Sequence, residues 1–336
     1  MQAMDEPRCA RYRRMNCAPR PLGFRDCLVA LFVASTSTYC GVIEYPHSQA
    51  LIDTSGDLAA AGSGVHETTA EMSGASGVTI QLGNDVVAKE DVIAFIHIGH
   101  SNMAGRGGRP EELRPYFFEE TNPHAWMYHP GSPPELAKEP FTAGDDAAAL
   151  YRLGGPGAAL LKQAVEMAPD KHFMSLGFGR ANAWCSQYLP GGLYYDAMMA
   201  APKAVMDRVT FAGIVVMLGI TEHDEGETAA SMFPQCIKTV VTAIRTDLGQ
   251  PDLPLLINGY EQESTGIWAV GGDVASRIIP EINKVPGVVY NSAIVPSDGV
   301  TMQDDHHFDL NGHKIWSRRV LEVMKEKGWF PWAKPD

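Results

Sequence analysis

A serine follows the most apolar strand-like run of the chain. Residues 92–98 form an unbroken β-branched and aromatic run that stops at Gly99-His100-Ser101-Asn102. Strands buried on both faces have such runs, and open α/β sheets bind ligands at the carboxyl ends of their strands. The pattern predicts Ser101 at that edge as a candidate nucleophile, although serine at such a turn also commonly caps the next helix.

A base and a carboxylate for this serine stand near the other end of the chain. A serine hydroxyl needs a base within hydrogen-bond reach, and that base needs a third group to orient it. Asp304 and His307 have the right types and spacing, because a carboxylate three residues earlier in a loop can fold back onto one imidazole nitrogen. The other nitrogen would then face Ser101, so we expect Ser101, His307 and Asp304 to be the catalytic residues.

Together, these two segments resemble the first and last sequence blocks of the SGNH hydrolase superfamily. Within it the chain is most similar to the sialate O-acetylesterase and carbohydrate esterase family 6 group, which carries Gly-Gln-Ser-Asn-Met where this chain has Gly99-His100-Ser101-Asn102-Met103. The resemblance implies an α/β fold, a three-layer α/β/α sandwich with a mainly parallel sheet. It also implies a cofactor-free serine esterase that removes O-acetyl groups from carbohydrates of the acetyl-xylan or sialate type through an acyl-enzyme.

Two middle segments carry further parts of the resemblance. Gly154-Gly155-Pro156-Gly157 is similar to a family segment whose glycine amide binds the oxyanion, a role that falls on Gly155, although Gly-Pro also simply starts helices. The run from Gly177 to Trp184 is similar to a second family block. The resemblance thus implies an oxyanion hole made by the amides of Ser101 and Gly155, with the Asn182 side chain as a candidate donor.

The chain departs from the family pattern at one oxyanion donor. Ile220 stands where the family has a glutamine, and losing one such donor typically costs a hundredfold to a thousandfold in turnover. Asn182, Asn102, Thr221 and His223 are candidate replacements. We expect five residues to bind substrate or to support the residues that do: His100, Asn102, Glu222, His223 and Asp224.

Two other classes of function remain open. The cluster from Asp304 to His307, with His223 and Asp224, has ligand types that suit a divalent metal, although adjacent residues rarely point at one ion. Alternatively, the missing glutamine marks a catalytically weak or inactive homologue that binds glycans. Its binding residues would be Trp126, Trp184 and Trp268.

The amino-terminal region predicts a leader and a linker before one enzyme domain. Residues 1–40 contain basic residues, a short apolar run and a Ser/Thr cluster, the layout of a secretory signal peptide, although an over-extended start is the alternative. Residues 41–89 are rich in Gly, Ser, Ala and Thr and predict a linker or a poorly ordered extension, with one possible strand near its end. Residues 90–330 form the predicted esterase domain, in a secreted or periplasmic protein.

Charge and cysteine content limit the partners. The leader carries six arginines against three acidic side chains, so removing it changes the net charge from −13 to about −16. Such an acidic surface would not bind nucleic acid or an anionic membrane, and it suits a soluble carbohydrate. Cys185 and Cys236 could be bridged in an oxidising compartment or could remain buried thiols. Oligomeric state is not readable from the sequence.

Strand-like and helix-like runs alternate from residue 91 onward, which predicts parallel strands joined by helices. The predicted strands are 92–98, 172–176, 211–218, 253–257 and 288–290. The predicted helices are 157–167, 228–248, 274–283 and 310–327. The nucleophile follows the first of these strands, and the base precedes the last helix.

Overall fold

The structure of the protein is a computed structural model that describes residues 77–106, 120–139, 154–260, 274–304 and 307–334. The predicted leader, residues 1–40, lies outside the described residues, as does the predicted linker up to residue 76. All described residues belong to one unit of the chain, Glu71–Asp336.

A mainly parallel sheet forms the middle layer of the fold. Its central strand β3 (Val92–Gly99) is buried along its whole length and pairs in parallel with β6 (His172–Gly179) and β7 (Thr210–Met217). Over the described residues the strand order is β5-β4-β6-β3-β7-β8-β9, in which only β5 is antiparallel to its neighbour. The outer strands are β4 (Ala125–Met127), β5 (Glu135–Leu136), β8 (Leu255–Asn258) and β9 (Ser292–Val295).

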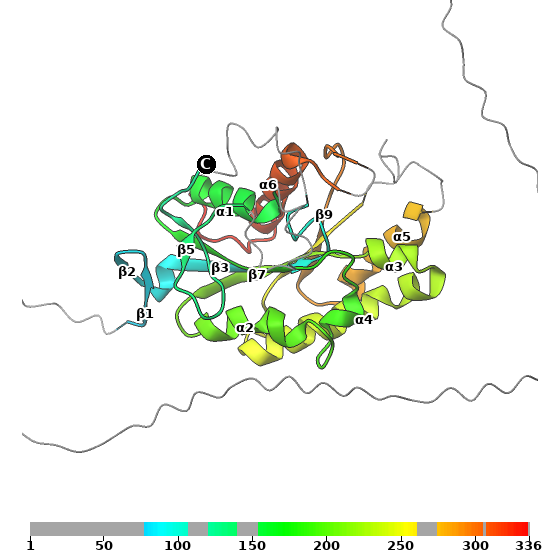
Figure 1. Ribbon diagram of the computed structural model, residues 1–336, viewed down its shortest axis with the longest axis horizontal. Helices are drawn as coiled ribbons and strands as arrows, with labels where there is room; N and C mark the ends of the chain where they lie inside the picture. The colour runs from blue at the N-terminus through cyan, green and yellow to red at the C-terminus, as the bar shows by residue number, and fades with distance from the viewer. Residues whose placement is uncertain (1–76, 107–119, 140–153, 261–273, 305–306, 335–336) are drawn as a thin grey trace, which may run out of the picture. The chain divides into compact units, whose positions relative to one another are not determined.

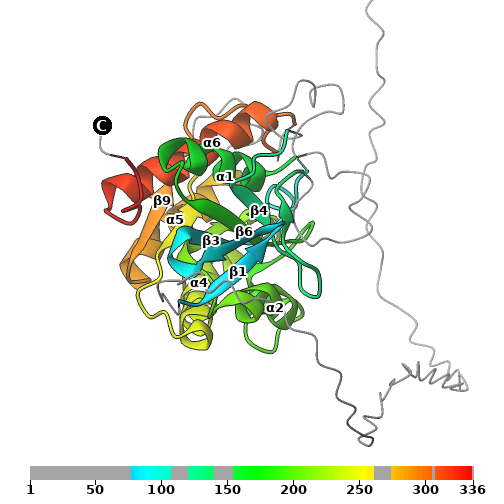
Figure 2. The same cartoon turned by 90° about the vertical axis from the view of Figure 1, so that its left-hand side faces the viewer.

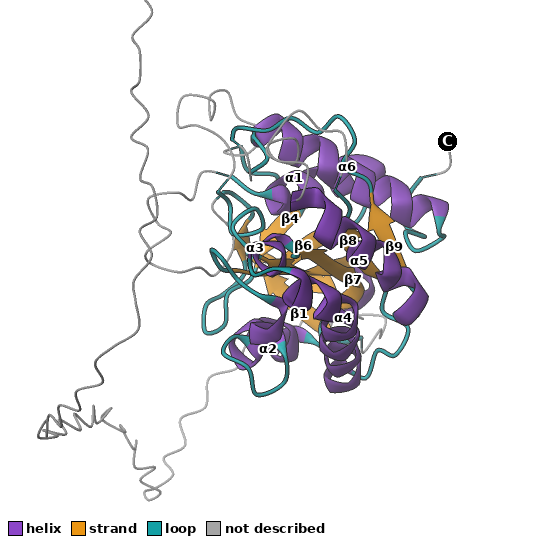
Figure 3. Ribbon diagram, turned by 90° about the vertical axis from the view of Figure 1, so that its right-hand side faces the viewer, coloured by secondary structure: helices purple, strands orange, loops and turns teal. Residues whose placement is uncertain are grey.

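Helices cover both faces of this sheet (Figures 1 and 3). One face carries α1 (Pro156–Met167) and α6 (Leu310–Glu326), which pack against each other. The opposite face carries α2 (Tyr195–Val205), α4 (Glu227–Leu248) and α5 (Val274–Val288), with the short α3 (Ile220–Asp224) beside them. The predicted three-layer sandwich is therefore confirmed. Along the described part of the chain, none of the helices combines the length and the apolar character that crossing a bilayer requires.

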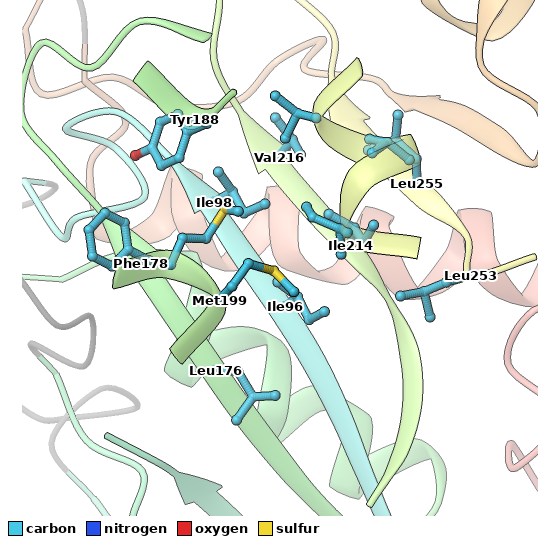
Figure 4. Packing of buried hydrophobic residues seen from close by; sticks show 14 of the residues in the cluster. Ile96, Ile98, Leu176, Phe178, Tyr188, Met199, Ile214, Val216, Leu253 and Leu255 are labelled. Atoms are coloured by element: carbon cyan, nitrogen blue, oxygen red, sulfur yellow. The ribbon is translucent and has the colours of Figure 1, made fainter. Parts of the chain in front are cut away.

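The side chains of β3 alternate between two hydrophobic cores. Ile93 and Phe95 face α1 and α6, whereas Ile96 and Ile98 pack toward the other helical layer, where Figure 4 shows them beside Met199 of α2. Because both faces are filled, every residue of β3 is buried. Burial on both faces explains the unbroken apolar run in the sequence, and it holds the end of β3, from which the segment with Ser101 continues, in place.

The amino-terminal part of the described chain is a hairpin that precedes β3. The range 41–89 was predicted to be a linker or poorly ordered extension with one possible strand near its end, and within it β1 (Thr79–Leu82) and β2 (Asp85–Ala88) form an antiparallel hairpin at the start of β3 (Figure 2). Ile80 and Leu82 are buried in the core on the α2 side, while Thr79 and Gln81 are exposed. This period-two alternation gives the hairpin one apolar face, and its burial orders the segment.

One predicted strand is wrong in position. Residues 288–290 were expected to be a strand, but α5 continues to Val288 and the strand β9 begins at Ser292. The predicted helix from residue 274 is correspondingly longer. Ile278, Ile282, Val285 and Val289 are all buried at helical spacing, and Val289 N still donates to Val285 O, so the buried helical face extends as far as Val289.

A disulfide joins two elements near the carboxyl end of β6. Cys185 begins the short 3-10 helix η4 (Cys185–Tyr188), Cys236 lies on α4, and their Cα atoms are 6.1 Å apart. Of the two states left open by the sequence, the structure has the bridge. Disulfides persist mainly in oxidising compartments.

Replacing both Cys185 and Cys236 with serine should lower the free energy of unfolding by about 3–4 kcal/mol. The bridge spans a sequence separation of 51 residues, and closing a loop of that length removes entropy from the unfolded chain. Urea unfolding with and without a thiol reductant measures this. Reduced wild type should match the double variant, and equal stability of the oxidised wild type and the double variant would contradict the expectation.

Candidate active site

The nucleophile turn begins where the central strand ends. Ser101 lies two residues beyond β3, at the carboxyl edge of the sheet, and is 9 % exposed. Backbone hydrogen bonds hold the turn: His100 N donates to Met217 O over 2.9 Å, Ala104 N to His100 O over 2.9 Å, Gly105 N to Asn102 O over 3.3 Å, and Arg106 N to Ser101 O over 3.0 Å. The hydroxyl of Ser101 is thus presented by backbone that is fixed on both sides.

Two glycines allow this turn to pack onto the strand ends. A Cβ at Gly99 would lie 2.5 Å from Met217 O and 2.7 Å from Met103 Cβ. A Cβ at Gly179, the last residue of β6, would lie 2.6 Å from Ala104 N. Real side chains do not tolerate such distances to backbone. Gly99 is therefore needed where the turn packs against β7, and Gly179 is needed where it packs against β6.

A continuous hydrogen-bonded chain connects a hydroxyl, an imidazole and a carboxylate. Ser101 Oγ lies 2.8 Å from His307 Nε2, and His307 Nδ1 lies 2.9 Å from both carboxylate oxygens of Asp304. Because ionised Asp304 only accepts hydrogen bonds, the hydrogen is on Nδ1, and Nε2 is left to accept from the serine hydroxyl. This arrangement can remove a proton from Ser101 and stabilise the resulting imidazolium.

The loop that carries His307 is fastened to the nucleophile turn. Asp304 Oδ1 also accepts from the backbone amide of His307 over 2.8 Å, and the side-chain oxygen of Asn102 accepts from Phe308 N over 2.9 Å. The side chain of His307 is 7 % exposed, whereas that of Asp304 is 45 % exposed. Asn102 therefore links two segments that are distant in the sequence.

The amides of Ser101 and Gly155, the predicted oxyanion donors, belong to neighbouring segments of backbone. Gly155 precedes α1, and a Cβ placed on it would lie 3.2 Å from Gly105 Cα and 3.3 Å from Asn102 O, so its backbone runs beside the nucleophile turn. Within the described residues, the amides of Ser101 and Gly155 donate no hydrogen bond. They are the two amides that the resemblance implies for the oxyanion hole.

Asn182 occupies the turn that follows β6. Its φ is 54°, a left-handed conformation that asparagine tolerates, and its side chain is exposed. The turn closes through Ala183 N, which donates to Arg180 O over 3.2 Å. Donation by Asn182 to an oxyanion stays a prediction.

Ile220, which replaces the family glutamine, has an apolar environment. It begins α3 after Gly219, whose φ is 119°, and packs with Tyr260, Ile279 and Met302. Its side chain is 8 % exposed. The side chain at position 220 is thus hydrocarbon and can donate no hydrogen bond, unlike the glutamine of the family pattern.

Glu222 and His223 of α3 are buried, and Glu222 supports the fold around the site. One carboxylate oxygen of Glu222 accepts from the amide of Cys185, which ties α3 to the loop after β6. Burial raises the pKa of Glu222. Substrate contacts by Glu222, His223 or Asp224 stay predictions, and the side chain of Asp224 lies outside the described residues.

Three polar residues near the site were not singled out from the sequence: Tyr260, Asn258 and His313. Tyr260 Oη lies 3.2 Å from His100 Nε2, and Asn258 ends β8 with its side chain accepting from Leu218 N over 3.0 Å. The position of Asn258 and Tyr260 at the carboxyl end of β8 was the available signal. His97, in contrast, bonds to Ser175 inside the sheet and does not line the site.

His313 is an imidazole enclosed by the core. It is fully buried on the first turn of α6, packs edge-on against Phe308, and among the described residues neither ring nitrogen has a hydrogen-bond partner. Burial, with a smaller effect of nearby His307 and His100, lowers the pKa of His313 from 6.5 to about 3. The folded protein therefore holds this ring neutral.

Replacing His313 with methionine should make stability less sensitive to acid. Below pH 6.5 the unfolded chain protonates this residue while the folded protein does not, so stability is lost as pH falls from 6.5 toward about 3. The contribution is about 1.4 kcal/mol per pH unit. Urea unfolding across this range should give a shallower slope for the variant by about that amount, and superimposable slopes would contradict the expectation.

The geometry bears on both alternative functions. His307 directs one ring nitrogen at Ser101 and the other at Asp304, so neither ring nitrogen is directed at a metal. Within the described residues no group of three His, Cys, Asp or Glu side chains is placed to hold a metal ion. Trp126 is 6 % exposed and donates to His172, so it offers no face to a glycan. Trp268 and His306 lie outside the described residues.

A parallel sheet with a Ser-His-carboxylate chain at its carboxyl edge is an arrangement of α/β serine hydrolases. The chain belongs to the family described as "Carbohydrate esterase, sialic acid-specific acetylesterase", whose profile matches residues 91–326. The resemblance seen in the sequence is thereby confirmed. The protein is a carboxylic ester hydrolase of a carbohydrate acetylesterase family.

Solved structures share the fold at low sequence identity. A protein of Arabidopsis thaliana is 17% identical with a TM-score of 0.56, over 70% of this chain and 98% of that one. NanS is 16% identical with a TM-score of 0.54, over 71% and 97% of the two chains. XAC1771, a carbohydrate acetylesterase from Xanthomonas citri, is 11% identical with a TM-score of 0.51, over 72% and 57%. No curated protein matches the chain significantly.

Proposed function

We propose that this protein is a serine esterase that removes O-acetyl groups from carbohydrates through a Ser101-His307-Asp304 triad and an acyl-enzyme. The observation that carries the proposal is the hydrogen-bonded chain of Ser101 Oγ, His307 and Asp304, with links of 2.8 and 2.9 Å. These distances are within the reach that proton transfer between a nucleophile and its base requires.

The first half of the reaction forms the acyl-enzyme. His307 Nε2 accepts the proton of Ser101 as Oγ attacks the acetyl carbonyl, and Asp304 stabilises the imidazolium. The carbonyl oxygen becomes an oxyanion that accepts hydrogen bonds from the amides of Ser101 and Gly155, with the side chain of Asn182 as a third candidate. His307 then gives its proton to the departing sugar oxygen, which leaves acetyl on Ser101.

The second half returns the enzyme to its starting state. His307 Nε2 removes a proton from a water molecule, and the resulting hydroxide attacks the acetyl carbonyl of the acyl-enzyme. The same amides hold the second oxyanion. Its collapse breaks the bond to Ser101 Oγ, which recovers its proton from His307, and acetate leaves.

The substrate is an acetylated oligo- or polysaccharide, of the xylan or sialate type. The family of the chain supports this class. We also propose that the protein is secreted or periplasmic with residues 1–40 as the leader, and the disulfide between Cys185 and Cys236 supports an oxidising compartment.

A panel of acetylated oligosaccharides tests the proposal. Acetate release and the mass loss of each sugar should identify one preferred acetylated class, whereas the same sugars without acetyl groups should remain unchanged. Turnover that persists in the presence of a chelator is expected, because no step needs a metal. Binding of acetylated glycans without release of acetate from any of them would contradict an esterase and support the glycan-binding alternative.

A further inference from the structure

A second hydrogen-bonded chain, formed by His100 and Tyr260, ends at the backbone of the nucleophile turn. His100, which stands where the family group has glutamine, is 2 % exposed. Its Nδ1 lies 3.3 Å from the backbone nitrogen of Asn102, and its Nε2 lies 3.2 Å from Tyr260 Oη. Tyr260 Oη in turn donates to Leu218 O over 3.3 Å. The chain therefore runs from the end of β7 to the residue next to the nucleophile.

The direction of each hydrogen bond follows from the donors present. The backbone N–H of Asn102 can only donate a hydrogen bond, so Nδ1 of His100 is the acceptor and carries no hydrogen. The hydrogen of the neutral ring is then on Nε2 and is donated to Tyr260 Oη, whose own hydrogen goes to Leu218 O. One tautomer of His100 satisfies all these contacts: the backbone N–H of Asn102 selects it, and the hydroxyl of Tyr260 accepts its remaining hydrogen.

The far end of this chain is anchored in the sheet. The side-chain oxygen of Asn258, at the end of β8, accepts from Leu218 N over 3.0 Å. Tyr260 packs on Ile220, the residue in the place of the glutamine. Two departures from the family pattern, at residues 100 and 220, thus converge on one tyrosine.

We infer that Tyr260 and His100 are positioning residues for Ser101: through the amide of Asn102 they hold the nucleophile turn in the orientation that His307 and the oxyanion amides require. The inference rests on the proposed function of Ser101. Neither residue needs to touch the substrate, because their effect passes through the backbone on either side of the serine. A small displacement of a reacting group is costly in rate, whereas substrate binding is affected little.

Replacing Tyr260 with phenylalanine tests the inference, because it removes one hydroxyl and keeps the ring against Ile220. We expect kcat for an acetyl ester to fall about tenfold with KM within twofold, and the rate of fluorophosphonate labelling to fall by a similar factor. The matched control is Tyr290→Phe. Tyr290 is 72 % exposed and lies before the amino end of β9, whereas the proposed site lies at the carboxyl ends of the strands. That variant should retain wild-type values.

Two substitutions at His100 complete the test. Glutamine can accept from the Asn102 amide and donate to Tyr260, so His100→Gln should keep at least a third of kcat, whereas His100→Leu should lose tenfold or more. The inference is wrong if Tyr260→Phe retains kcat and labelling rate within twofold, or if glutamine and leucine are equally damaging. If Ser101→Ala retained full activity, the proposed function itself would fail.

Discussion

The Ser101→Ala variant should lose at least about 10⁴-fold in kcat for p-nitrophenyl acetate and for acetylated sugars. The substitution removes the only protein atom that the proposal assigns to nucleophilic attack, and removal of one member of such a triad leaves only binding and oxyanion stabilisation. The loss should appear in kcat with KM little changed. Initial-rate kinetics with freshly purified variant measures it.

The fold of this variant should be intact. Ser101 is held by backbone contacts of its neighbours, and its side chain contributes one hydrogen bond to His307. Thermal unfolding should therefore differ from wild type by no more than a few degrees. Ser132→Ala, at an exposed serine, is the matched control and should be fully active. A Ser101→Ala enzyme with wild-type turnover would remove this residue from the mechanism.

The Asp304→Asn variant should lose about 10²- to 10³-fold in kcat. Asparagine presents an amide donor toward His307, which favours the tautomer with hydrogen on Nε2 and stops that nitrogen from accepting the Ser101 proton. Removal of a fully buried carboxylate costs about 10⁴-fold. Because the side chain of Asp304 is 45 % exposed, water can replace part of its interaction, and we expect a smaller loss.

The experiment on Asp304 must separate the loss of His307 orientation from the loss of one negative charge. Asp298→Asn removes the same charge from an exposed position in the same region of the chain and should keep full activity. Fluorophosphonate labelling of the Asp304→Asn variant should slow together with its kcat, because both reactions use the same base. Full activity of Asp304→Asn would show that another group orients His307.

Two parts of the Ser101-His307-Asp304 arrangement were predictable because each is local in the sequence. The apolar run before Gly99 defines a buried strand whose end presents Ser101, and Asp304 and His307 are close enough in the chain for one to orient the other. The contact between the two segments was not local, since Ser101 and His307 are 206 residues apart. The pairing was predicted because a serine nucleophile needs a base, and because both segments resemble blocks of the same family.

The parts that were missed depend on tertiary contacts without a local pattern. Tyr260 meets His100 across 160 residues, and nothing in the residues around either one indicates the pairing. The short strands β4 and β5 have only three and two residues, which is too little for a periodicity to appear. At residues 288–290, β propensity competed with the buried face of α5, and packing prevailed.

The most direct test of the central claim is the mass of the protein caught during turnover. Wild-type enzyme quenched in acid while hydrolysing an acetyl ester, or treated with a fluorophosphonate, should carry one added acyl or phosphonyl group. Peptide mapping should place that group on Ser101, and it should be absent from Ser101→Ala. A modification on another residue, or active turnover with no labelling of Ser101 by either reagent, would contradict the account.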